Sequence, residues 1–134
     1  MAFLSKLGKY KNTGLLFMRV GLGVMFVYHG YPKLLGGPHK WTALGGAAKL
    51  IGIHFLPVVW GFLSACTETF GGFLLVIGLA FRPVCLLLLI NMVVAALFTY
   101  SGEGLMAASH AIEDGVVFLG LLFVGPGSYS VDKK

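Results

Sequence analysis

Four apolar stretches, each close to the length that crosses a lipid bilayer, dominate this sequence. They lie near residues 13–31, 57–81, 83–100 and 105–124. A helix needs about 20 apolar residues to span the hydrocarbon core. Hydrophobic residues make up 57% of the chain and charged residues only 11%, which leaves little material for a soluble domain. The sequence therefore predicts an all-α fold, a bundle of four transmembrane helices, in a single domain over residues 1–134.

Lysine and arginine in the short loops predict the orientation, because cytoplasmic loops carry the excess of these residues. One side of the membrane would hold Lys6, Lys9, Lys11, Arg82, Lys133 and Lys134. The other would hold Lys33, Lys40 and Lys49. This count places both termini in the cytoplasm and predicts a multi-pass protein of the inner (plasma) membrane. The lysines form no basic face, so the lipid bilayer is the expected partner and no nucleic acid is.

The long connection between the first two spans runs from Pro32 to Leu56. If it is helical, one face holds Trp41, Leu44, Ala48 and Ile51. Two interpretations stay open. The segment is either an interfacial helix that lies as a lid over the outer end of the bundle, or an irregular loop.

Ionisable residues inside the spans are the main functional signal. A charge at bilayer depth costs roughly 2.5–3.5 kcal/mol on insertion scales, so each one needs a partner or a wet cavity. Asn91 adds an uncharged polar group in the third span. The residues selected as a ligand-binding site or buried polar cluster are Arg19, His29, Lys33, Glu68, His110, Glu113 and Asp114.

Helical spacing and side-chain direction predict how these residues group. Arg19 shares a helix face with Gly23 and Gly30, and such a glycine-lined face suits the bundle interior. Side chains lean toward the N-terminus of their own helix, so Glu68 leans toward the outer end and Lys33, while Arg19 leans inward. We expect a polar cluster in the outer half. Arg19 is either functional or a snorkelling residue near the boundary, whereas Glu68 lies too deep to reach water.

His110, Glu113 and Asp114 stand at i, i+3 and i+4, so the imidazole can touch either carboxylate. Di-metal bundles take Glu-x-x-His from two helices and two further glutamates, and this chain holds one reversed copy and one extra glutamate. No metal site is therefore predicted. A haem held by His29 and His110 has still less support. Nucleotide-binding loops and nucleophile elbows are missing as well, so a self-sufficient catalyst is not expected.

Several ordered motifs resemble the DoxX family of membrane proteins. They are Arg19-Val-Gly-Leu-Gly, His29-Gly-Tyr-Pro-Lys33, Glu68-Thr-Phe-Gly-Gly72, Gly78-Leu-Ala-Phe-Arg82 and Gly125-Pro-Gly-Ser-Tyr-Ser. The likeness covers about Leu15 to Ser130. It implies a four-helix membrane bundle with a link to redox and sulfur chemistry. Relatives form the membrane subunit of a thiosulfate:quinone oxidoreductase, and others associate with superoxide dismutase and a sulfurtransferase.

The leading functional hypothesis is a membrane component of a redox or sulfur-metabolism system, which binds a quinone or a small sulfur species within the bundle. Glu68 or His110 would take up a proton in the quinone reaction. Redox protein partners and a homo-oligomer fit this picture, and if the protein is an enzyme it is a quinone-linked oxidoreductase subunit. The rival is a non-enzymatic scaffold, assembly factor or chaperone, by analogy alone. A transporter would need a continuous polar path, for which four helices are too few unless the chain oligomerises.

Overall fold

The computed structural model of the protein describes residues 4–46 and 55–132, and within these ranges every regular element is a helix. The elements are the 3-10 helix η1 (Ser5–Tyr10) and the α-helices α1 (Lys11–Leu35), α2 (Gly37–Gly45), α3 (Pro57–Ile77), α4 (Phe81–Glu103) and α5 (Leu105–Val124). Four helical segments, η1 continued by α1, then α3, α4 and α5, are long and apolar enough to cross a membrane. The predicted all-α fold with four spans is confirmed.

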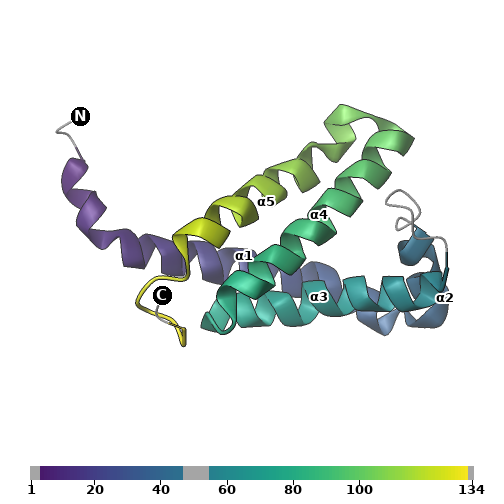
Figure 1. Cartoon of the computed structure of the whole chain (residues 1–134), viewed down its shortest axis with the longest axis horizontal. Coiled ribbons are helices and arrows are strands. Elements are labelled where there is room, and N and C mark those ends of the chain that lie inside the picture. The colour runs from purple at the N-terminus through teal and green to yellow at the C-terminus, as the bar shows by residue number, and fades with distance from the viewer. Residues whose placement is uncertain (1–3, 47–54, 133–134) are drawn as a thin grey trace.

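The spans form two antiparallel pairs. Helices α1 and α3 pack along each other, α4 and α5 form the second pair, and the α3–α4 contact joins the two (Figure 1). Both described ends of the chain lie on the same side of the bundle, which we call the terminal end; the opposite side, which carries α2, is the loop end (Figure 1). The protein is therefore a multi-pass membrane protein. That the terminal end faces the cytoplasm stays a prediction.

The helix ends differ from the predicted spans where the backbone has a local reason to turn. Helix α3 stops at Ile77, short of 81, because Gly78 adopts the left-handed conformation, with φ 73°, that terminates many helices. Helix α1 continues to Leu35 although Pro32 lies inside it. Helix α4 begins at Phe81, so Pro83 still falls in the first turn. The bounds of α5 match the predicted span of residues 105–124.

The connection between α1 and α3 contains a helix, α2, as one of the two interpretations expected. It is short, and Ala48 and Ile51 of the predicted face lie outside the described residues. Close backbone contact binds α2 to α3: a Cβ added at Gly61 would lie 1.6 Å from the carbonyl oxygen of Trp41. The indole ring of Trp41 also packs edge-on against Phe62, with ring centroids 4.7 Å apart. The position of α2 relative to the membrane surface stays a prediction.

Side-chain packing is concentrated between α3, α4 and α5 and on one face of α1. Phe26 of α1 meets Phe118 of α5 edge-to-face, with ring centroids 5.1 Å apart, and Leu75, Phe81 and Leu88 are fully buried beside them. Helices α1 and α3 approach through glycine: a Cβ added at Gly23 would lie 2.4 Å from the carbonyl oxygen of Gly72. Most side chains on the other faces of the spans are exposed, as expected for helices that meet lipid.

Candidate functional site

A polar network joins α1, α3 and α4 near the middle of the bundle. The ammonium of Lys33 donates to both oxygens of Glu68, at 3.1 Å to Oε1 and 2.9 Å to Oε2. Asn91 Nδ2 donates to the same Oε1 at 3.1 Å, and Ser64 Oγ donates to Asn91 Oδ1 at 2.7 Å. The Glu68 side chain is 6% exposed and that of Lys33 31%. Glu68 is thus a buried carboxylate with one cationic and one neutral donor, which satisfies its need for partners at this depth.

Glycine in α1 makes this pairing possible. A Cβ added at Gly30 would lie 2.7 Å from the backbone nitrogen of Thr69 and 2.8 Å from the Cβ of Glu68, so only glycine lets the two helices touch here. Lys33 follows three residues later on the same face, one turn beyond the contact. Trp41 Nε1 donates to the carbonyl oxygen of Lys33 at 3.1 Å, which ties α2 to the end of α1.

A second polar group joins α1 to α5. The imidazoles of His29 and His110 have ring centroids 6.4 Å apart. His110 Nδ1 lies 3.6 Å from Asp114 Oδ2, one helical turn away, and the His110 side chain is 77% exposed while that of Asp114 is 21% exposed. Glu113 is exposed, and within residues 4–46 and 55–132 its carboxylate accepts no hydrogen bond and forms no ion pair.

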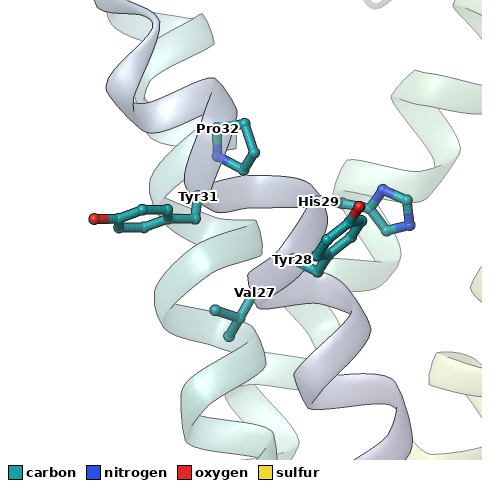
Figure 2. A pocket seen from close by; sticks show the side chains of 5 residues that line it. All are labelled: Val27, Tyr28, His29, Tyr31 and Pro32. Atoms are coloured by element: carbon teal, nitrogen blue, oxygen red, sulfur yellow. The ribbon is translucent and has the colours of Figure 1, made fainter.

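A cavity of about 480 Å³ opens on the surface of α1 beside this group. Its lining consists of Val27, Tyr28, His29, Tyr31 and Pro32. Tyr28 and His29 project from one side of the helix and Tyr31 from the other (Figure 2). Because proline has no N–H, the carbonyl oxygen of Tyr28 lacks the helical hydrogen bond that residue 32 would supply. The phenol of Tyr28 and the imidazole of His29 therefore lie on one side of the helix, and the phenol of Tyr31 lies on the other (Figure 2).

Arg19 lies apart from these groups, at the terminal end. Its guanidinium is fully buried and donates to the carbonyl oxygens of Leu75 at 3.2 Å, Val76 at 2.9 Å and Tyr129. The first two acceptors belong to the last turn of α3, and the third to the tail of residues 125–132. Of the seven residues selected from the sequence, the structure brings Lys33 to Glu68 and groups His29, His110 and Asp114, with Glu113 adjacent in α5. It does not bring Arg19 to any of them.

The tail that receives Arg19 also closes the turn between α3 and α4. The carboxylate of Asp132 accepts from the backbone N–H groups of Ala80 at 3.1 Å and Phe81 at 2.7 Å, which are free donors at the start of α4. The backbone of Val131 and Asp132 donates in turn to the carbonyl oxygens of Ile77 and Gly78. This tail is a structural part of the bundle.

Ser64 and Trp41 were not selected from the sequence, although both contribute to the network. Ser64 precedes Glu68 by one helical turn and so shares its face, which is a readable signal. Trp41 sits in a connecting segment, where no periodicity relates it to Lys33. Among the described residues, no three His, Cys, Asp or Glu side chains converge in a way that could hold a metal ion.

Comparison with known proteins yields a family and one relative of note. The sequence model of the DoxX family matches residues 14–101. An uncharacterized protein of Haemophilus influenzae is 29% identical over 138 residues, which cover 98% of this chain and 97% of the relative. No solved structure matches the chain.

Proposed function

Because the chain belongs to the DoxX family of membrane proteins, we propose that it is the membrane component of a redox or sulfur-metabolism system and binds a quinone headgroup in the cavity beside His29. The redox link comes from the family resemblance. The observation that carries the quinone assignment is the cavity itself, where the imidazole of His29 and the phenol of Tyr28 lie on one side of a membrane-spanning helix (Figure 2). All five lining residues belong to α1, so a bound headgroup would lie against the surface of this helix.

The lining suits the chemistry of a quinone. A quinone carbonyl accepts hydrogen bonds, which the phenol of Tyr28 or an imidazole N–H of His29 can donate, and the ring can lie against Val27 and Pro32. A quinol hydroxyl donates instead, and the acceptor nitrogen of a neutral His29 imidazole can receive it. The same cavity therefore offers partners to both redox states.

Reduction of a quinone to a quinol consumes two electrons and two protons. The electrons would come from a redox protein partner or a small sulfur species, and we assign proton transfer to His29, with His110 and Asp114 behind it. Imidazole is the side chain that most readily exchanges protons near neutral pH. Glu68 is less suited to this task, because Lys33 and Asn91 both hold its carboxylate.

Quinone content of the purified protein tests this proposal. The protein would be purified in mild detergent from quinone-containing membranes, and bound quinone extracted and quantified by mass spectrometry. His29→Ala is expected to lose most of the bound quinone, while the control His39→Ala, an exposed histidine of α2, retains it. An unchanged content in His29→Ala, or an empty wild-type protein that takes up no added quinone, would refute the assignment.

The second candidate function is a scaffold or assembly factor. It is supported by the way the two most buried charges, Arg19 and Glu68, are occupied by partners inside the chain. Under this alternative the charges hold the bundle together and no ligand is needed. Glu68→Gln would then reduce the yield of folded protein and the recovery of a co-purifying protein, and His29→Ala would change neither. The quinone measurement on the same preparations separates the two functions.

A further inference from the structure

Glu113 presents an unusual problem for a membrane protein. It is the ninth of the 20 residues of α5, about 12 Å along the axis from the start of the helix, and its side chain is exposed. No hydrogen bond or ion pair reaches its carboxylate from the part of the chain that the structure describes. A charge exposed to lipid at this depth costs roughly 2.5–3.5 kcal/mol on insertion scales. Residues 4–46 and 55–132 therefore supply no partner for this carboxylate.

The face of α5 that carries Glu113 has the spacing of a helix-packing seam. Steps of four and three residues alternate along it, which is the repeat that keeps one face toward a partner helix. The residues of this seam are Met106, His110, Glu113, Val117, Gly120 and Val124. Val117 is half-buried and the other five are exposed. Nothing lies within 4 Å of a Cβ added at Gly120, so another backbone can approach there.

We propose that this seam packs against the same seam of a second copy, with Glu113 of each copy bound to His110 of the other. Two copies inserted in the same orientation place equal residues at equal depth. Glu113 leans toward the N-terminus of its helix, which brings its carboxylate to the level of residue 110. In a two-fold symmetric interface a contact from Glu113 to His110 is repeated in reverse, so both exposed groups are satisfied at once.

The contacts of His110 within its own chain are compatible with this pairing. Asp114 of the same helix lies beside Nδ1, at 3.6 Å, and the His110 side chain is 77% exposed, which leaves Nε2 for a carboxylate from outside. Arg19 and Lys33 already have partners within the chain, since Arg19 donates to backbone carbonyls and Lys33 to Glu68. The complementary groups thus lie on one seam, one turn apart, which favours a second copy over an unrelated helix.

Disulfide cross-linking in membrane vesicles tests the proposal with a matched pair of variants. Val124 lies on the seam and is 61% exposed, whereas Val116 is 63% exposed and lines an apolar cavity between α4 and α5 on another face. Under mild oxidation Val124→Cys should form a dimer of twice the chain mass, at least tenfold above both Val116→Cys and the unsubstituted chain. The last control accounts for the native Cys66 and Cys85.

A second pair of variants tests the contact itself. Gly120→Leu added to Val124→Cys should abolish the cross-link, while Gly14→Leu, at another glycine with open space around it, should leave it unchanged. Glu113→Ala should lower the yield severalfold and Glu113→Gln, which can still hydrogen-bond to the imidazole, should lower it less. Equal cross-linking of Val116→Cys and Val124→Cys would overturn the proposal, as would a Val124→Cys product with a different protein in place of the dimer. The cross-linking yield does not depend on quinone content. The dimer proposal and the quinone proposal can therefore fail independently of each other.

Discussion

Lys33 Nζ lies within hydrogen-bond distance of both carboxylate oxygens of Glu68, at 3.1 Å and 2.9 Å, so one ammonium spans the carboxylate. This contact joins the last turn of α1 to the middle of α3. Since Glu68 is 6% exposed, the pair compensates a charge that the bundle has removed from water. A buried pair of this kind is costly to break from one side only, because the remaining charge stays buried.

Lys33→Met should therefore destabilise the folded bundle by about 3 kcal/mol, the lower end of the range for broken buried pairs, because Lys33 is itself 31% exposed. The double variant Lys33→Met, Glu68→Leu should recover most of that loss, since it leaves no unpaired charge. Denaturation with increasing sodium dodecyl sulfate measures both. A double variant as unstable as the sum of the two single variants would contradict the pairing.

Arg19→Gln should release the tail as well as destabilise the bundle. The guanidinium is the group that ties Tyr129 to the end of α3, and glutamine is too short to keep all three carbonyl contacts. We expect chymotrypsin to cleave at Tyr129 at least tenfold faster in this variant. Arg82→Gln is the control, because Arg82 is exposed and bonds to the end of α5, at the carbonyl oxygens of Leu122 and Phe123. Equal cleavage rates in the two variants would refute the role of Arg19.

Asp132→Ala should cost about 1 kcal/mol, the usual effect of removing a side chain that caps the start of a helix. The carboxylate accepts from the backbone nitrogens of Ala80 and Phe81, and alanine leaves both donors free. Asp132→Asn keeps one acceptor oxygen, so its stability should lie between those of the unsubstituted chain and Asp132→Ala. Thermal unfolding in detergent provides the measurement. Ser128→Ala should be neutral, because Ser128 contributes its backbone N–H and not its hydroxyl to the contact with Asn12.

Two glycines of α1 that stand two residues apart should respond in opposite ways to alanine. A Cβ at Gly23 would lie 2.4 Å from the carbonyl oxygen of Gly72, so Gly23→Ala has to separate α1 from α3 and should cost more than about 1 kcal/mol. Nothing lies within 4 Å of a Cβ at Gly21, so Gly21→Ala should be neutral or stabilise by up to about 1 kcal/mol through helix propensity. Thermal unfolding of both variants would show changes in stability of opposite sign. Similar losses of stability in the two variants would mean that α1 and α3 do not make their closest contact at Gly23.

The sequence was sufficient to predict the four spans, because apolar length alone identifies a membrane-crossing helix. The lean of side chains also indicated that Glu68 turns toward Lys33 and that Arg19 lies toward the opposite end. The partners of Arg19 could not be predicted from the sequence. They are backbone carbonyls of Leu75, Val76 and Tyr129, which no side-chain pattern marks.

Helix ends depended on tertiary contacts that are absent from local sequence. Pro32 was expected to lie beyond the first span, yet α1 continues past it to Leu35, where the indole of Trp41 binds the carbonyl oxygen of Lys33. The turn at Gly78 is held by the tail, through Asp132 and the backbone of Val131.

The reach of Arg19 across the chain imposes an order on biosynthesis. The ribosome makes Arg19 with the first span, its partners Leu75 and Val76 with the second, and Tyr129 only 110 residues after Arg19. Until the fourth span has entered the bilayer, the guanidinium lacks its last acceptor and the terminal end stays open. We therefore expect a nascent chain stalled before residue 125 to hold Arg19 in contact with the insertion machinery or with lipid phosphates, and its assembly to finish only after the tail has emerged.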